Sequence, residues 1–283
     1  MHEGDPTAYA KSYDHGNVYL QQDNANQESG YLPVNSTTGS AIFYTTYEAQ
    51  TPTSPLSQTP LLICLQGGLG GSSMIGNFLE LGPWRVNFSH TQNVEHLGLE
   101  PNSGSWNRIF GLLFVDNPIG TGFSFAATEE EIPRDQFSVA EEEIPRDQFS
   151  VAKHLFIAIS GFLESDPLFK TRPVYFTGES YAGKYVPAIG YYTLKKNLNL
   201  PETKRVNLQG VAIGNGLTDP ETQITTHALN AYFSGLINER QKSEIEKAQW
   251  EAVKLVKMGN WSEATNARNG MITLSRFLIK QVW

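Results

Sequence analysis

The sequence predicts an α/β fold built on a mostly parallel central sheet, followed by a helical segment at the carboxy-terminal end. Four short apolar runs have the composition of buried strands, at residues 61–65, 109–115, 174–177 and 206–213. Segments with helical spacing separate the later runs, and this β-α-β alternation is typical of a parallel sheet. Beyond residue 225 only amphipathic helical spacing is found, so the predicted sheet is incomplete and its last edge is unpaired.

Composition divides the 283 residues into three parts. Residues 1–28 are rich in Gln, Asn, Asp and Gly, which predicts a flexible lead-in. Residues 29–225 carry the strand runs and are the predicted core, which begins with two strands at 31–34 and 41–47. Residues 226–283 are the predicted helical insertion.

The 12 residues EEEIPRDQFSVA at 129–140 are repeated without change at 141–152. Twelve residues make about 3.3 helical turns, so a helix cannot absorb one copy and keep its apolar stripe in register. Pro133 and Pro145 would also break such a helix. The second copy runs directly into an apolar helical face that starts at Val151. We therefore expect the second copy to dock and the first to loop out on the surface.

Charge and composition exclude several classes of function. The net charge of −8 and the isoelectric point near 5.3 argue against nucleic acid or an anionic membrane as a partner. No apolar run reaches the roughly 18 residues of a membrane span, and the amino terminus lacks the features of a signal peptide. The single cysteine, Cys64, cannot form an intrachain disulfide and is expected to be a small buried hydrophobe. No metal site or cofactor is predicted. Candidate acceptors for N-glycosylation are Asn35, Asn87 and Asn260.

One stretch has the layout of a nucleophile elbow. A strand run at 174–177 ends at Gly178, Ser180 follows two residues later, and a helical segment begins at Tyr181. A strand-to-helix turn of this kind presents a serine hydroxyl to a cleft. Gly183 stands one position later than in the usual G-x-S-x-G pattern. A purely structural glycine-serine turn is the alternative interpretation.

Two other strand runs end in glycine-containing turns. Residues 66–73, QGGLGGSS, follow the first buried run and predict either a flexible loop or an oxyanion or carboxylate site. A phosphate-binding loop is excluded because no Gly-Lys-Ser/Thr follows. Residues 116–122, DNPIGTG, follow the second run, and we interpret Asp116 as part of a proline-glycine turn.

Seven motifs, in this order and spacing, resemble those of the serine carboxypeptidases and carboxypeptidase-like proteins, and most closely the plant members. The resemblance runs from about Ser29 to about Ala264 and implies an α/β-hydrolase fold. It also implies a serine-type peptidase that releases carboxy-terminal amino acids from peptides through an acyl-enzyme, without a cofactor. A secretory, vacuolar or extracellular location is implied as well, with a homodimer as one arrangement. The motifs are SGYLPVN (29–35), LQGGLGGSS (65–73), ELGP (80–83), SWN (105–107), DNPIGTGFS (116–124), GESYAGKYVP (178–187) and GNGLTDP (214–220).

The resemblance implies a role for each matching position. Ser180 matches the nucleophile, and the backbone N–H groups of Gly68 and Tyr181 match the oxyanion hole. Two acids that meet share a proton, because ionising both is costly, so one of them can donate a hydrogen bond to a carboxylate. The alternatives are that Glu80 is an exposed helix acid and Glu179 a solvated turn residue. The set that matches the grip on the substrate's terminal carboxylate is Gln66, Gly67, Glu80 and Glu179.

The sequence departs from the family pattern at the general base. In the family the order is Ser, acid and His, and of the six histidines only His227 follows Ser180. The acid and histidine of relatives lie beyond the helical insertion, so we expect the chain to be truncated before both and inactive as it stands. Asp219 and His227 are a weaker alternative pair, because the resemblance makes GNGLTDP a structural loop.

The glycine loop departs as well: relatives have Trp, Pro and Cys where Cys64, Leu69 and Gly71 stand. Three hypotheses follow. The chain represents an incomplete copy of a serine carboxypeptidase; it is a non-catalytic truncated homologue, inert or peptide-binding; or it is a fragment of an acyltransferase relative that uses the same triad.

Overall fold

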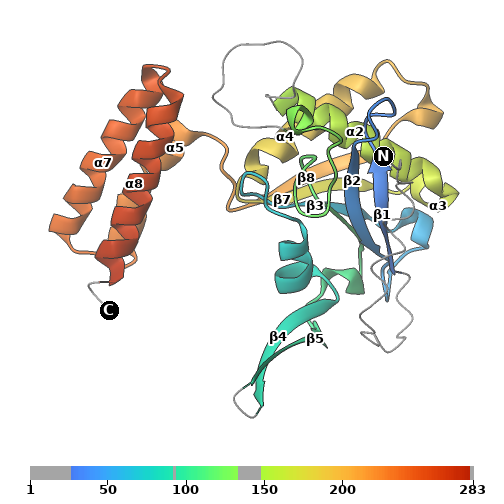
Figure 1. Cartoon of the computed structure of the whole chain (residues 1–283), viewed down its shortest axis with the longest axis horizontal. Coiled ribbons are helices and arrows are strands. Elements are labelled where there is room, and N and C mark those ends of the chain that lie inside the picture. The colour runs from blue at the N-terminus through green and yellow to red at the C-terminus, as the bar shows by residue number, and fades with distance from the viewer. Residues whose placement is uncertain (1–26, 92–93, 133–147, 281–283) are drawn as a thin grey trace, which may run out of the picture.

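The computed structural model describes residues 27–91, 94–132 and 148–280. Its centre is a six-stranded sheet with the strand order β1-β2-β6-β3-β7-β8 (Figure 1). Strands β6, β3, β7 and β8 are parallel, whereas β1 and β2 pair antiparallel at one edge. The predicted mostly parallel α/β fold is confirmed. The strands are β1 (Gln27–Pro33), β2 (Ala41–Tyr47), β3 (Leu61–Leu65), β6 (Gly111–Val115), β7 (Val174–Glu179) and β8 (Leu208–Gly214).

Helices α2 and α4 cover one face of this sheet. Alternate residues of a strand point to opposite faces, so Leu61 and Ile63 of β3 pack with these helices in the larger core. Leu62 and Cys64 instead join a smaller apolar cluster on the other face. Cys64 is a free, buried cysteine, as expected from the sequence. The helices on this part of the chain are α2 (Gln148–Ser165), α3 (Pro167–Lys170) and α4 (Ala182–Asn197).

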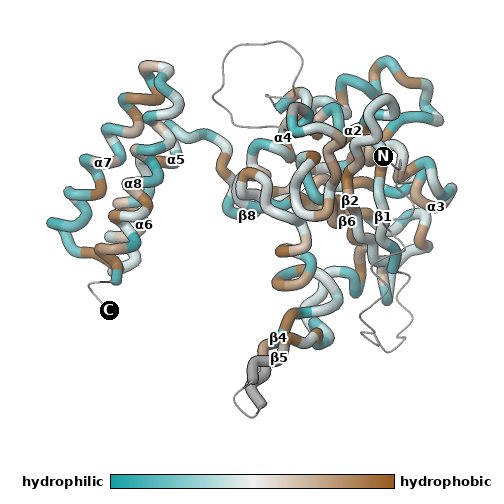
Figure 2. Tube along the Cα trace, in the orientation of Figure 1, coloured by the Kyte–Doolittle hydropathy of each residue, from teal (hydrophilic) through white to brown (hydrophobic). Residues whose placement is uncertain are grey.

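A two-stranded hairpin, β4 (Trp84–Thr91) and β5 (Val94–Pro101), extends away from the main sheet (Figure 1). It follows a π-helical turn at Gly76–Leu81. Phe88 and Leu97 pair across the two strands and are 60% and 70% exposed, and brown positions mark the hairpin in Figure 2. This hairpin is not among the predicted strands, although apolar residues alternate at 84, 86 and 88 and again at 97 and 99.

The carboxy-terminal part is helical, as the spacing predicts, and its two long helices stand apart from the sheet (Figure 1). It has its own apolar cluster, which includes Ile245, Ala252 and Met271. A reciprocal capping box between Asn238 and Gln241 begins the first long helix. No described helix is both long and apolar enough to cross a bilayer. The helices are α5 (Pro220–Ile224), α6 (His227–Phe233), α7 (Glu239–Lys257) and α8 (Trp261–Lys280).

Strand β8 is an edge strand that pairs with β7 on one side only. Its sequence, LQGVAIG, contains no charged residue and no proline, and Val211 and Ile213 are exposed. Natural proteins usually protect such an edge with charge, proline or a covering element.

The prediction for the duplicated segment is partly wrong. Residues from Gln148 onward, in the second copy, begin α2 as expected. The first copy does not simply loop out, however, because Glu131 accepts hydrogen bonds from the hydroxyls of Thr38 and Ser40. Ile132 also lies beside Gly120, where a Cβ would come within 2.9 Å of the isoleucine side chain. The remainder of both copies, 133–147, lies outside the described residues. Contacts with loops elsewhere in the chain hold the start of the first copy. Such contacts cannot be predicted from helix periodicity, which depends only on neighbouring residues.

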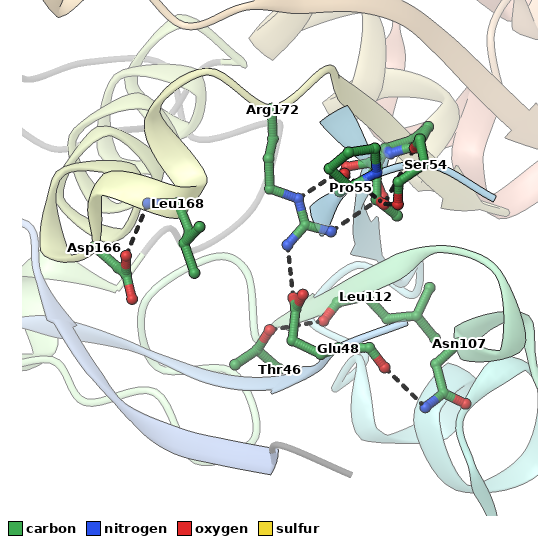
Figure 3. Close-up of polar contacts among 11 residues, drawn as sticks. Thr46, Glu48, Ser54, Pro55, Asn107, Leu112, Asp166, Leu168 and Arg172 are labelled. Carbon is green, nitrogen blue, oxygen red and sulfur yellow. Dashed lines mark hydrogen bonds and ion pairs between the residues drawn. The ribbon is translucent and has the colours of Figure 1, made fainter. Parts of the chain in front are cut away.

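A buried arginine joins three segments of the chain, and its contacts are drawn in Figure 3. Arg172 is fully buried, and its guanidinium donates to the Glu48 carboxylate at 2.6 Å and to the Thr59 carbonyl oxygen at 2.8 Å. Arg172 lies just before β7, Glu48 directly follows β2, and Thr59 lies just before β3. The network therefore connects the ends of three strands of the sheet. Removing one partner of such a pair leaves an uncompensated buried charge.

Candidate active site

The elbow between β7 and α4 is a strained turn with Ser180 at its apex. The backbone φ of Ser180 is +59°, in the left-handed region that costs a non-glycine residue roughly 1–2 kcal/mol. Hydrogen bonds hold the turn on both sides: the Ser180 N–H donates to Gly214 O at 3.1 Å, and the Leu217 N–H donates to Ser180 O at 2.7 Å. The GNGLTDP motif therefore buttresses the elbow, which agrees with its interpretation as a structural loop.

Close backbone approach explains the small residues around the serine. A Cβ on Gly178 would lie 2.5 Å from the Ala182 Cβ, and one on Gly183 would lie 2.6 Å from the Leu217 backbone nitrogen. Gly183 thus serves the elbow although it stands one position late in the usual pattern. Within the described residues the Ser180 hydroxyl has no hydrogen-bond partner, so it is free to meet a ligand or a base.

The glycine loop at residues 66–73 packs directly against this elbow. A Cβ on Gly67 would lie 2.5 Å from the Tyr181 nitrogen and 2.7 Å from the Ser180 Cβ, so only glycine fits there. In the part of the chain that the structure describes, neither the Gly68 N–H nor the Tyr181 N–H donates a hydrogen bond. Two unpaired donors beside a serine hydroxyl are the groups that an oxyanion requires.

Three polar side chains meet next to the elbow, from strands β3 and β7 and from the π-helical turn. Gln66 Nε2 donates to Glu179 Oε2 at 3.4 Å. The pKa of Glu80 is raised by burial and then by the charge of Glu179 and a hydrogen bond with it. Two carboxyls that meet can share one proton, because ionising both of them is costly. Glu80 is exposed and Glu179 is half-buried, so both side chains are reached by solvent at this site.

A pocket of about 430 Å³ opens beside this cluster on the face of the sheet opposite α2 and α4. Its polar end is formed by Gln66, Glu80 and Glu179, whereas Ser180 is not among the residues that line it. Sequence reasoning missed the role of Trp106 in its wall, although the SWN motif contains this residue. Cys64, expected only to be buried, lies on the pocket floor, and burial raises the pKa of its thiol to about 12. The apolar lining comprises Cys64, Leu65, Leu81, Trp106, Phe114, Ala212 and Ile213.

Asp219 and His227 stand at the starts of two different short helices, and no hydrogen bond or ion pair joins them among the described residues. Asp219 is the N-cap of α5 and accepts from the Thr222 N–H at 2.7 Å, which lowers its pKa. His227 begins α6, where burial and the nearby Arg268 lower its pKa. Among the described residues, no group of three His, Cys, Asp or Glu side chains could hold a metal ion.

The three candidate glycosylation sites differ in their surroundings. Asn87 is exposed on β4 and donates to Glu100 at 3.0 Å, and Asn260 is exposed before α8. Asn35 is half-buried and accepts from the Thr37 N–H at 3.0 Å in a tight turn. All three lie at the surface of the described chain.

Comparison with known proteins gives a consistent result. A sequence profile of serine carboxypeptidases matches residues 19–276. The chain is 58% identical over 247 residues to serine carboxypeptidase-like 50 of Arabidopsis thaliana, covering 87% of this chain and 51% of that protein. It is 37% identical over 248 residues to the probable serine carboxypeptidase CPVL of Homo sapiens, covering 85% of this chain and 46% of that one.

A solved structure agrees with these matches. The crystal structure of Kex1(delta)p, a prohormone-processing carboxypeptidase from Saccharomyces cerevisiae, superposes with a TM-score of 0.69 at 27% identity. The match covers 88% of this chain and 53% of that structure. The chain thus spans about half the length of the relatives it matches.

Proposed function

The chain belongs to the serine carboxypeptidase family, and on this premise we propose that its site binds the carboxy-terminal residue of a peptide and presents the last peptide carbonyl to Ser180. The observation that carries the proposal is the meeting of Gln66, Glu80 and Glu179 beside the elbow. This cluster is suited to a terminal carboxylate, which an internal peptide bond lacks.

The proposed nucleophile is Ser180, and the proposed oxyanion donors are the Gly68 and Tyr181 N–H groups. Support comes from the strained turn, the unpartnered hydroxyl and the two unpartnered donors. In an acyl-enzyme mechanism the hydroxyl oxygen attacks the carbonyl carbon, and the donors stabilise the negative charge that develops on the carbonyl oxygen. Removing one such donor typically lowers turnover by about 10²–10³.

The proposed carboxylate grip consists of Gln66, Gly67, Glu80 and Glu179. The amide of Gln66 and the shared proton of the acid pair are hydrogen-bond donors for the two oxygens of a terminal carboxylate. The shared proton is present only while one acid of the pair is protonated. Since the pKa of Glu80 is raised, the grip is strongest at acid pH and weakens as the pH rises through that raised value.

A second candidate function is peptide binding without turnover, and a specific observation favours it. Within the described residues no histidine contacts Ser180, and the one histidine that follows it in sequence lies in α6 beside Arg268. Loss of the base can lower turnover by roughly 10⁶. We infer that residues 1–283 by themselves bind a peptide carboxy terminus but do not hydrolyse it at a measurable rate. Acyl transfer would need the same base.

A secretory-pathway location is part of the proposal. It is supported by family membership and by exposed acceptor asparagines at Asn87 and Asn260. A mobility shift after N-glycosidase treatment of the protein from its native host would support it, and an unmodified chain would contradict it.

Binding and turnover are tested separately on the purified chain. An N-acetylated dipeptide with a free carboxylate should bind at pH 5 more tightly than its carboxy-amidated analogue, and Glu80→Gln should reduce that preference. Equal affinity for the two peptides would contradict the proposed function. Turnover should equal that of Ser180→Ala; turnover abolished by His227→Ala in a folded protein would instead make His227 the base.

A further inference from the structure

Asp116 is a buried carboxylate at the end of β6, and both of its oxygens are occupied by neutral donors. Oδ1 accepts from the Ser72 hydroxyl at 2.7 Å and from the Ser73 N–H at 2.8 Å. Oδ2 accepts from the Phe123 N–H at 2.9 Å. The side chain is fully buried, and among the described residues it has no ion-pair partner. Burial raises its pKa, and these hydrogen bonds oppose that rise.

The Asp116 contacts continue into the backbone of the glycine loop. Ser73, held by Asp116, uses its own hydroxyl to accept the Gln66 N–H at 3.1 Å and to donate to Val115 O at 2.5 Å. The loop is closed a second time by the Gly71 N–H, which donates to Gly67 O at 2.8 Å. The start of the loop, which carries the proposed carboxylate grip and oxyanion donor, is therefore fixed to the end that Asp116 holds.

The fixed end of this loop touches the elbow. Gly67 is the residue whose missing Cβ leaves room for the Tyr181 nitrogen and the Ser180 Cβ. A shift of a few tenths of an ångström at Gln66 would therefore change the distance between the serine and the proposed oxyanion donors. The Asp116 side chain itself does not line the pocket.

A second loop is built around the same carboxylate. Ser124 Oγ donates to the Asp116 carbonyl oxygen at 2.6 Å, and the Asp116 N–H donates to Phe43 O at 3.0 Å. Gly122 has φ +55°, and a Cβ there would lie 2.2 Å from Asp116 Oδ2. The glycine is required both by its backbone conformation and by the space that the carboxylate occupies.

A carboxylate is the one common side chain that suits these three donors. It accepts on both oxygens and donates on neither, whereas an asparagine would direct its NH₂ group at a donor. A buried carboxylate without a neighbouring cation is costly in free energy. The proline-glycine turn at residues 116–122 does not by itself account for a carboxylate at position 116.

We propose that Asp116 is the positioning residue of the glycine loop, holding Ser72 and Ser73 and, through the Ser73 hydroxyl, the Gln66–Gly68 backbone against Ser180. The inference rests on the proposed function, which gives Gln66 and Gly68 their roles.

The test compares Asp116→Asn with Asp219→Asn, a matched change at an exposed helix cap whose carboxylate accepts from the Thr222 N–H and has no hydrogen bond to the glycine loop among the described residues. Amide hydrogen exchange is followed at residues 66–73 and at β3 and α4. In Asp116→Asn the loop amides should exchange about tenfold or more faster, the effect of losing one hydrogen bond, while β3 and α4 keep their protection. Asp219→Asn should leave the loop unchanged. Loop exchange within twofold of the unaltered protein in folded Asp116→Asn overturns the inference, as does an equal increase throughout the protein.

A second variant covers the case in which Asp116→Asn does not fold. Ser73→Ala keeps the Ser73 N–H that donates to Asp116 and removes the hydroxyl that accepts the Gln66 N–H and donates to Val115 O. The Gln66 amide should therefore exchange about tenfold faster while β3 remains protected. No change at Gln66 overturns the inference. Affinity for the free-carboxylate dipeptide should fall about tenfold in either folded variant, relative to Asp219→Asn. If the unaltered chain does not distinguish free from amidated peptide, the proposed function fails, but the exchange experiment still decides the role of Asp116.

Discussion

Deleting one copy of the duplicated segment should stabilise the protein. Removing residues 133–144 joins Ile132 to Pro145 and yields the same sequence as removing either whole copy. The remaining EEEIPRDQFSVA retains both sets of contacts, because Glu131 and Ile132 dock at its start and α2 begins at the glutamine near its end. Among the described residues the deletion removes no contact, and it shortens the connection between the two docked ends.

The magnitude follows from that length. In the parent chain 15 residues, 133–147, connect Ile132 to Gln148, and after the deletion three remain. In the flexible-chain approximation the closure cost scales as 1.5 RT ln n, so a fivefold shortening contributes about 1.4 kcal/mol. For a protein of this size the corresponding rise in Tm is roughly 2–3 °C.

Urea unfolding monitored by tryptophan fluorescence measures the difference, with thermal unfolding as a second readout. A matched control replaces residues 133–144 by 12 Gly and Ser residues and should leave stability within about 0.5 kcal/mol of the parent, because the length is kept. Point variants show which copy docks. Glu131→Ala should cost about 1 kcal/mol through its lost hydrogen bonds, whereas Glu143→Ala, the equivalent change in the second copy, should cost little.

Two results would refute this reasoning. A deletion variant that is less stable than the parent would mean that three residues cannot join the two docked ends, so that one docking site is wrong. A cost for Glu143→Ala equal to or above that for Glu131→Ala would mean that the second copy supplies the docked glutamate.

Three further predictions concern the core, the sheet edge and the acid pair. Arg172→Met should lower the free energy of unfolding by about 3 kcal/mol, because the Glu48 carboxylate, whose side chain is only 16% exposed, loses its cation and the Thr59 carbonyl oxygen loses its donor. Lys204→Met, at an exposed pair, should cost less than about 1 kcal/mol, and similar losses for the two variants would contradict this reasoning. The uncharged edge of β8 is expected to promote self-association, so Val211→Lys should raise the fraction of monomer measured by light scattering. Unchanged self-association would show that this edge does not form the contact between molecules. Glu80 has a folded-state pKa above its unfolded value, so its contribution to the free energy of unfolding is complete below about pH 4.3 and is lost as the pH rises through the folded-state value. Glu80→Gln should flatten this part of the plot of unfolding free energy against pH, measured by urea unfolding. A plot that the substitution leaves unaltered would mean that another group causes the pH dependence.

The sequence alone was sufficient for features that depend on neighbouring residues. Apolar runs identified the strands of the parallel sheet, although β6 begins two residues later than predicted, β7 ends two residues later, and the bounds of β8 differ by one to two residues. The glycine and serine spacing identified the elbow, and the helical spacing identified the carboxy-terminal part. These predictions succeeded because strand periodicity, helix periodicity and turn chemistry are local properties of the chain.

Tertiary structure decided everything that depends on residues distant in the chain. Gln66 and Glu179 are 113 positions apart, and only the parallel pairing of β3 with β7 brings them together. Asp116 was interpreted as a turn residue because its donors, on two different loops, cannot be identified from its neighbours. The docking of Glu131 was missed for the same reason, since its hydroxyl partners lie about 90 residues earlier in the chain. A residue's type limits the chemistry available to it, and the fold selects which partners that chemistry meets.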